Sequence, residues 1–182
     1  MAKRWFDVVI SAIAILLFSW LFVLVGISAA LSTQSSGLFS QQRIGRYGKP
    51  FTIYKFRTMH AKTARINAVS LFLRRSKLDE IPQLFNVIKG DMSLVGPRPD
   101  IPGYYDKLVG EAAKLLELRP GITSMASVRF KNEEALLARQ PDPLRYNDEV
   151  IFPEKVRMNL EYYENQSFLL DLKILLKTIF QK

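Results

Sequence analysis

Two adjacent carboxylates, Asp79 and Glu80, are the residues of this sequence whose types and spacing most specifically indicate catalysis or metal binding. Pro82 follows them closely, and Gly90 comes after a short run of mostly apolar residues. Because proline has no amide hydrogen to donate, it suits the first turn of a helix, and glycine suits the residue that ends one. The sequence therefore predicts that both carboxylates lie at or just inside the start of a short helix.

The pair has a structural and a chemical interpretation. Asp79 could serve as a helix N-cap, with Glu80 stabilised by the helix dipole. Neighbouring carboxylates also repel each other, however, so a divalent metal or a cationic ligand would stabilise them. Basic residues flank the pair in the sequence: Arg74, Arg75, Lys77 and Arg98. Arginines beside a helix N-terminus bind phosphate readily, which indicates a site for a metal and a phosphorylated substrate.

The run from Leu78 to Pro99 resembles the core of the small monotopic bacterial phosphoglycosyl transferases, also called bacterial sugar transferases. The resemblance extends over nearly the whole chain, through the segments Arg4–Asp7, Gln42–Gly45, Tyr54–Met59, Arg119–Thr123 and Asp171–Lys173. Enzymes of this family move a sugar 1-phosphate from a nucleotide-activated sugar onto polyprenyl phosphate. The resemblance therefore implies a membrane-bound transferase that starts a cell-surface glycan.

The resemblance assigns a role to each candidate site residue. It implies that Asp79 is the nucleophile, which forms a covalent phospho-aspartate and releases UMP, and that Mg²⁺ is held by Asp79 with Glu80. Whether Glu80 joins the metal or handles protons is left open. The residues expected to bind substrate phosphates are Lys55, Arg74, Arg98 and Lys131. Lys131 stands where family members carry an arginine, and lysine lacks the planar guanidinium fork.

The same resemblance implies partners and a location. The substrates are expected to be a UDP-sugar and undecaprenyl phosphate, with the catalytic part on the cytoplasmic face of the bacterial inner membrane. The net charge of +9 is then expected to attract anionic lipid and substrate phosphates, with no nucleic acid as partner. A homodimer stays open, as does the sugar. The alternatives are a membrane-tethered basic binding module and an inactive scaffold of a glycan assembly complex.

Composition excludes several other kinds of site. The chain of 182 residues has no cysteine and one histidine, His60. Disulfides, thiolate metal sites and histidine metal clusters are therefore excluded. We see no internal repeat and no low-complexity run, and the length suits one functional unit with a substantial core.

The segment from Val8 to Leu31 is the most apolar part of the chain, with fifteen residues that are Leu, Ile, Val or Phe. A signal peptide, a transmembrane anchor and a helix that bends and leaves on the same face are all compatible with it. Basic residues at both ends are awkward for a crossing helix. The resemblance implies the re-entrant form, but Ser19-Trp20 replaces the family's usual Ser-Pro break. The bend must then rest on a weaker device, such as a hydrogen bond from the Ser19 hydroxyl to a backbone carbonyl.

The predicted fold class is α+β, mostly α with a small β element. A membrane-embedded helix over residues 1–31 precedes a catalytic domain over 32–182, a compact cytosolic domain with interfacial amphipathic helices around it. Hydrophobic periodicity predicts a strand at 51–57, helices at 61–75, 101–118, 133–139 and 153–165, and an extended or looped segment at 122–130. The last helix, 168–180, either lies in the membrane interface or packs on the core.

Overall fold

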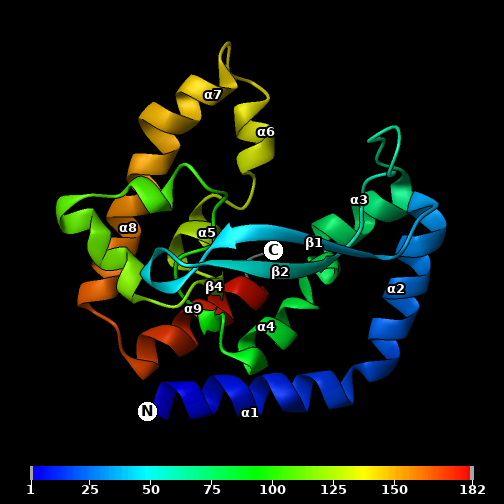
Figure 1. Cartoon of the computed structure of the whole chain (residues 1–182), viewed down its shortest axis with the longest axis horizontal. Coiled ribbons are helices and arrows are strands. Elements are labelled where there is room, and N and C mark those ends of the chain that lie inside the picture. The colour runs from blue at the N-terminus through cyan, green and yellow to red at the C-terminus, as the bar shows by residue number, and fades with distance from the viewer. Residues whose placement is uncertain (1, 181–182) are drawn as a thin grey trace. The chain divides into compact units, whose positions relative to one another are not determined.

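The computed structural model describes residues 2–180 and confirms the α+β class, since most of the chain is helical and the strands form two small two-stranded sheets (Figure 1). The chain divides into two compact units. The first unit comprises residues 1–43 and 50–93, and the second comprises 44–49 and 94–182. The predicted functional division at residue 31 depends on membrane insertion and stays a prediction.

The N-terminal apolar segment folds as two helices, α1 (Ala2–Leu17) and α2 (Ser19–Thr33), which meet at an angle of 70°. Among the described residues no single helix has the length and composition to cross a membrane, and this bent pair has them only when both arms are counted. The helix breaks at Phe18, whose φ of −105° and ψ of 18° leave the α-helical region. Within residues 2–180 the Ser19 hydroxyl makes no hydrogen bond, so the predicted device for the bend is wrong.

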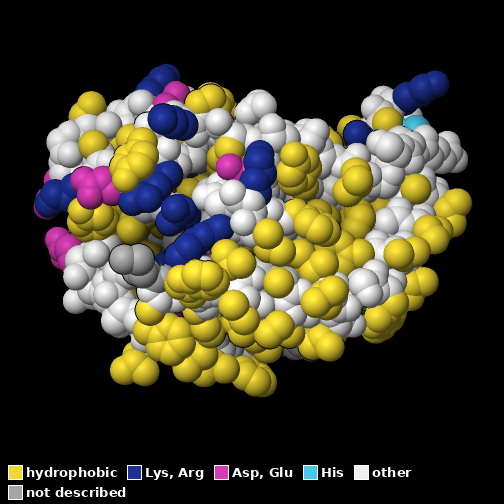
Figure 2. All heavy atoms as spheres, turned by 60° about the horizontal axis from the view of Figure 1, so that its bottom comes forward, with side chains coloured by type: hydrophobic (Ala, Val, Ile, Leu, Met, Phe, Trp, Pro, Cys, Tyr) yellow, Lys and Arg dark blue, Asp and Glu magenta, His cyan; other side chains and the backbone are white. Residues whose placement is uncertain are grey.

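Both arms of the bent pair leave large apolar side chains uncovered. The most exposed of them on α1 and α2 are Trp5, Leu16, Leu17, Trp20, Val23 and Leu31. Figure 2 shows hydrophobic side chains gathered along the surface where these two helices lie. Soluble proteins rarely expose so continuous an apolar patch, and such patches mark contacts with protein or membrane.

The remainder of the first unit packs a β-hairpin and three short helical segments against α2. The strands β1 (Leu38–Ile44) and β2 (Pro50–Phe56) pair, which confirms the predicted strand. Gly37 precedes β1 at a point where an added Cβ would overlap the carbonyl oxygen of Gly26 in α2. Only glycine therefore allows this close approach of the two backbones. Val25, Ala29, Phe56 and Leu73 form the buried cluster beneath.

The carboxylate pair lies between two short helices. These are α3 (Ala68–Arg75) and α4 (Gln83–Lys89), and the 3₁₀ turn η2 (Leu78–Glu80) joins them. The helix predicted at 61–75 is wrong in its first half, because the Asn67 side chain accepts a hydrogen bond from the Ser70 amide and caps α3 there. Gly90 ends α4 with a φ of 104°, as predicted.

Helix α1 is fixed to the end of α4 by polar contacts. The Arg4 guanidinium donates to the carbonyl of Val87 at 2.6 Å and to that of Met92 at 3.2 Å. The Ser93 hydroxyl donates to the Asp7 carboxylate at 2.6 Å, and the Asp7 side chain is buried. The positive charge of Arg4 complements the negative end of the α4 dipole. Helix α1 thus restrains the segment that follows the carboxylate pair.

The second unit contains the strands β3 (Ser93–Val95) and β4 (Gly121–Thr123), and most of its remaining residues are helical. Its 3₁₀ segments are η1 (Arg46–Gly48), η3 (Tyr105–Lys107) and η4 (Gly110–Glu117). The α-helix predicted at 101–118 is therefore wrong in type. Helix α5 (Met125–Arg129) also contradicts the extended segment predicted at 122–130, because the Ser124 hydroxyl accepts from the Ser127 amide and starts a helix.

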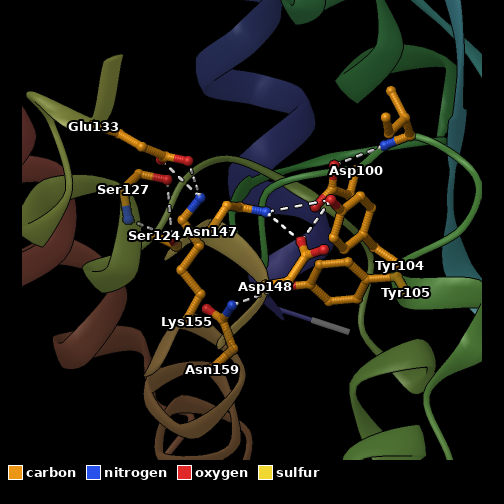
Figure 3. A network of polar contacts seen from close by, with 11 residues as sticks. Asp100, Tyr104, Tyr105, Ser124, Ser127, Glu133, Asn147, Asp148, Lys155 and Asn159 are labelled. Carbon is orange, nitrogen blue, oxygen red and sulfur yellow. Dashed lines mark hydrogen bonds and ion pairs between the residues drawn. The ribbon is translucent and has the colours of Figure 1, made fainter. Parts of the chain in front are cut away.

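Three later helices of the second unit confirm the prediction: α6 (Glu133–Leu137), α8 (Phe152–Glu164) and α9 (Phe168–Phe180). The helix α7 (Pro143–Tyr146) and the π-helical turn η5 (Asn147–Ile151) were not predicted. Figure 3 shows the polar contacts that hold α8 and η5 to neighbouring loops. Lys155 pairs with Glu133 at 2.7 Å, and the Tyr104 hydroxyl donates to Asp148 at 2.8 Å. Helix α9 buries Ile174 and leaves Leu169 and Phe180 exposed, so a membrane-interface position for it stays a prediction.

Candidate active site

A single 3₁₀ turn presents both carboxylates. Lys77 enters this turn in the left-handed region, with φ of 60° and ψ of 16°, a conformation that costs a side-chain-bearing residue about 1 kcal/mol. The amide of Glu80 then donates to the Lys77 carbonyl. Neither carboxylate caps this turn or α4, so the N-cap interpretation of Asp79 is wrong.

The burial of Asp79 disfavours the ionised form of its side chain. Its side chain is 9% exposed, and within residues 2–180 its Oδ1 atom has no hydrogen-bond partner. Burial, followed by the charge of Glu80, raises the pKa of Asp79 from 3.8 to about 6, while Lys55, Lys77 and Arg74 act in the opposite direction. A carboxylate with an unsatisfied oxygen, surrounded by cations, suits a role as nucleophile or ligand.

Glu80 is held by a cation from the hairpin. The Lys55 Nζ atom of β2 lies 3.2 Å from Glu80 Oε1, and the two side chains are 19% and 9% exposed. The ion pair fixes the orientation of Glu80 and places a positive charge beside Asp79. It also offsets part of the cost of burying two adjacent acids.

Asn86 joins β2 to the helix that follows the carboxylates. Its side-chain amide donates to the Thr52 carbonyl at 2.7 Å, and its Oδ1 accepts from the Tyr54 amide at 3.1 Å. Asn86 is fully buried. These two bonds join the backbone of β2 to a side chain of α4. They therefore fix the position of Lys55 in β2 relative to the turn before α4, which carries Asp79.

Replacing Asn86 with aspartate is expected to destabilise the protein by about 1–3 kcal/mol. The substitution keeps the acceptor for Tyr54 but leaves the Thr52 carbonyl without its donor, and it puts a second negative charge beside Asp91. Thermal unfolding in detergent measures the loss. Asn165→Asp is the matched control, because the Asn165 amide also donates to a backbone carbonyl, at 2.9 Å, but at an exposed position. Equal melting temperatures for the two variants would contradict the clamp role of Asn86.

The structure brings together four of the six predicted site residues. Lys55, Arg74, Asp79 and Glu80 all belong to the first unit, and both cations act on the charge of Asp79. Arg98 and Lys131 belong to the second unit. Arg98 lies there in the turn after β3, and it lines a small pocket with Ile44, Gly45, Pro97, Pro99, Tyr105 and Leu115. Binding of the same phosphates by Arg98 and Lys131 stays a prediction.

Three residues that support the site were not among the predicted ones. Lys77 was noted as one of the basic residues that flank the carboxylates, but it was given no role of its own. Asn86 carried a weaker signal, as a polar residue within an otherwise apolar helix face. Arg4 was noted only within the resembling segment Arg4–Asp7, because its contacts with the end of α4 join segments that are distant in the sequence.

The residues present fit a divalent ion that takes most of its ligands from elsewhere. Within residues 2–180, no three His, Cys, Asp or Glu side chains come together in a metal-binding group. Asp79 and Glu80 are adjacent, and one oxygen of Asp79 is unsatisfied. Magnesium keeps several waters and is commonly held by one or two carboxylates plus substrate phosphate oxygens. The pair is therefore suited to Mg²⁺ bound together with a diphosphate.

The chain is similar to known proteins over nearly its whole length. The sequence model described as bacterial sugar transferase matches residues 1–182. The chain is 35% identical to the UDP-glucose:undecaprenyl-phosphate glucose-1-phosphate transferase of Caulobacter vibrioides, over 97% of this chain and 68% of that protein. It is 35% identical to the uncharacterized sugar transferase EpsL of Bacillus subtilis, over 97% and 85% of the two chains. It is 33% identical to the UDP-N-acetylgalactosamine-undecaprenyl-phosphate N-acetylgalactosaminephosphotransferase of Aeromonas hydrophila, over 97% and 42%. With matches of this extent, the chain belongs to the bacterial sugar transferase family.

Proposed function

We propose that this protein transfers a sugar 1-phosphate from a UDP-sugar to undecaprenyl phosphate, with release of UMP. The observation that carries the proposal is the buried Asp79 carboxylate, which has an unsatisfied oxygen and three cations acting on it. The names of two relatives support the substrate classes, since both name undecaprenyl phosphate and a UDP-sugar. Those relatives differ in the sugar, so the sugar of this protein is a question for experiment.

In the first half of the reaction, a carboxylate oxygen of Asp79 attacks the β-phosphorus, which bears the sugar. The bond between that phosphorus and the bridging oxygen breaks, and UMP leaves with the bridging oxygen. Asp79 then carries the sugar-phosphoryl group as an acyl phosphate. Lys55 and Arg74 place positive charge where the equatorial phosphate oxygens become more negative, which lowers the barrier.

In the second half, a phosphate oxygen of undecaprenyl phosphate attacks the same phosphorus. The bond from phosphorus to the Asp79 oxygen breaks, so the carboxylate is restored and undecaprenyl diphosphate sugar is formed. No net proton is required from the protein if both phosphates enter and leave as anions. Glu80, held by Lys55, keeps the turn in place through both halves.

Asp79 and Glu80 would hold the divalent ion. When bound, Mg²⁺ would offset the repulsion between the carboxylate and the diphosphate and stabilise the leaving oxygen. The protein's own cations supply the remaining positive charge.

The bent pair of α1 and α2 supports a re-entrant position in the cytoplasmic face of the membrane. Its exposed apolar side chains would lie among lipid, and its bend of 70° would return the chain to the same side. Arg4 holds this element to α4 and Asp7 holds it to Ser93, so the carboxylate turn would lie at the depth of lipid headgroups. The acceptor's phosphate lies at that depth as well.

The purified protein in detergent is expected to release UMP continuously from at least one UDP-sugar when both undecaprenyl phosphate and Mg²⁺ are present. A panel of UDP-sugars identifies the donor, and a luminescent UMP assay measures the rate. Without the acceptor, release should stop after about one equivalent per enzyme, because Asp79 stays occupied. No release with any sugar would refute the proposal and favour a binding module or scaffold.

A further inference from the structure

An apolar groove of about 640 Å³ lies within the first unit, between α2, β2, the start of β1 and α4. Val23 and Ile27 of α2 form one wall, Tyr54 and Phe56 of β2 form a second, and Phe85 of α4 forms a third. This volume is in the range of small-molecule pockets, about 300–1,000 Å³. The groove is therefore large enough for a substantial part of a lipid-like ligand.

The groove has a fixed aromatic base. The Phe22 ring meets the Phe56 ring edge-on at a centroid distance of 6.3 Å and the Phe85 ring at 5.6 Å. Gly26 also lines the groove, and a Cβ there would lie 3.2 Å from Phe56 Cε1. These contacts define the shape of the groove before any ligand arrives, which favours a ligand of matching shape.

The groove begins next to the reactive carboxylates. Pro82, which lines it, is separated from Glu80 by Ile81 alone. A ligand with a polar head at Asp79 and an apolar tail would therefore find the start of an apolar path one turn away. The mechanism proposed above requires such a ligand, whose phosphate must reach the phosphorus carried by Asp79.

We infer that this groove binds the first isoprene units of the polyprenyl phosphate acceptor. The inference rests on the proposed function, which supplies the acceptor, and deepens it by assigning a subsite for the tail. Apolar surface does not leave water when a tail moves from lipid into protein, so the gain comes from packing alone. We therefore expect the groove to change acceptor use by about tenfold, mainly by orienting the phosphate.

A pair of tryptophan variants on one helix tests the groove. Val23 lines it and is 60% exposed, whereas its neighbour Leu24 is 53% exposed and does not line it. Val23→Trp should reduce kcat/KM for undecaprenyl phosphate about tenfold and leave kcat/KM for methyl phosphate, which has no isoprene unit, unchanged. Leu24→Trp should change neither. In both variants the UMP burst without acceptor should equal that of the wild type.

Leu38→Trp fills the groove from β1 instead of α2. A matching loss of kcat/KM for undecaprenyl phosphate in this variant would show that the effect of Val23→Trp does not come from a folding defect of α2. Equal effects of Val23→Trp and Leu24→Trp, or equal losses with both acceptors, would overturn the inference. So would weaker liposome binding by Val23→Trp with unchanged acceptor kinetics, because bilayer lipid would then occupy the groove.

Photo-crosslinking tests binding in the groove independently of the transfer reaction. A benzophenone-bearing polyprenyl phosphate should label the wild type and Leu24→Trp several-fold more than Val23→Trp. If this difference appeared but no UDP-sugar gave UMP, the proposed function would fail and the groove would stand. If UMP were released but labelling were equal in all three proteins, the groove would fail and the proposed function would stand. Loss of both signals would refute both.

Discussion

Replacing Asp79 with asparagine is expected to abolish turnover and, at the same time, to raise the melting temperature of the metal-free protein at pH 8. Turnover should fall by a factor of roughly 10³ or more, because asparagine cannot form the phosphoryl intermediate. The stability gain follows from the pKa of Asp79, which burial and the charge of Glu80 raise to about 6. Scanning fluorimetry in detergent with a chelator present, together with the UMP assay, measures both effects.

The pH dependence of the stability gain follows from the direction of this shift. The folded state binds the Asp79 proton more tightly than the unfolded chain does, so the wild type loses stability as the pH rises from below 3.8 to above about 6. The loss amounts to roughly 3 kcal/mol at pH 8. Asparagine carries no charge, so its advantage should be largest at pH 8, smaller at pH 5 and nearly absent at pH 4.

Asp142→Asn is the matched control for this experiment. Asp142 is exposed and caps α7 by accepting from the Arg145 amide, and asparagine caps a helix equally well. This variant should keep both its turnover and its melting temperature. Adding Mg²⁺ should raise the melting temperature of the wild type and leave that of Asp79→Asn unchanged. An Asp79→Asn protein that turned over normally would exclude the covalent mechanism.

Local sequence patterns predicted the parts of the fold that depend on local chemistry. Proline and glycine delimit α4, and the aromatic and β-branched run gives β2, because in both cases neighbouring residues determine the backbone. The helix predicted at 101–118 was wrong, also because of the local backbone. Its alternating small and apolar residues have helical periodicity, yet Gly103 and Gly110 both take a positive φ, and short 3₁₀ turns result.

The bend of the N-terminal segment was predicted for the wrong reason. The basic residues at both ends favoured a bent form, but the Ser19 hydroxyl plays no part in it. The backbone of Phe18 departs from helical geometry, and Leu21 and Phe22 resume the helix by donating to its carbonyl. Contacts at both arms, such as Arg4 with Val87 and Gly37 against Gly26, fix the direction of each arm separately. Such long-range contacts are not readable from the local sequence.

The candidate site likewise has features that the local sequence predicts and features that depend on long-range contacts. The carboxylate pair and its nearest cations are contiguous or nearly so in the sequence, and spacing alone indicated Asp79, Glu80 and Arg74. The resemblance to the family indicated Lys55 as a cation of the site, but its pairing with Glu80 joins residues on different elements and was not predicted. The burial of Asp79, which raises its pKa, depends on packing from several elements and could not be inferred from the sequence.

Replacing Lys55 with methionine should both destabilise the protein and impair catalysis. Methionine keeps most of the apolar stem but removes the charge that lies 3.2 Å from Glu80. Two buried carboxylates would then face each other with less compensation, at a cost of roughly 3 kcal/mol, the lower end for breaking a buried ion pair. Thermal unfolding at pH 8 measures this loss.

Lys114→Met is the control that isolates burial. Lys114 pairs with Glu111 at the same distance of 3.2 Å, but the two side chains are 47% and 68% exposed. Such a solvent-screened surface pair contributes little to stability, so its loss should hardly change the melting temperature. Equal destabilisation by the two substitutions would mean that the Lys55–Glu80 pair behaves like a surface pair.

A double variant separates the structural part of Lys55 from its chemical part. Lys55→Met combined with Glu80→Gln removes both charges of the ion pair, so much of the lost stability should return. Activity should stay low, because the site would still lack the positive charge that Lys55 places near the substrate phosphate oxygens. In Lys55→Met the pKa of Asp79 should rise further above 6, so the acid limb of the pH–rate profile should move to higher pH. A profile that stayed in place while the protein lost stability would confine Lys55 to a structural role and leave Arg74 and Lys77 as the cations that act on Asp79.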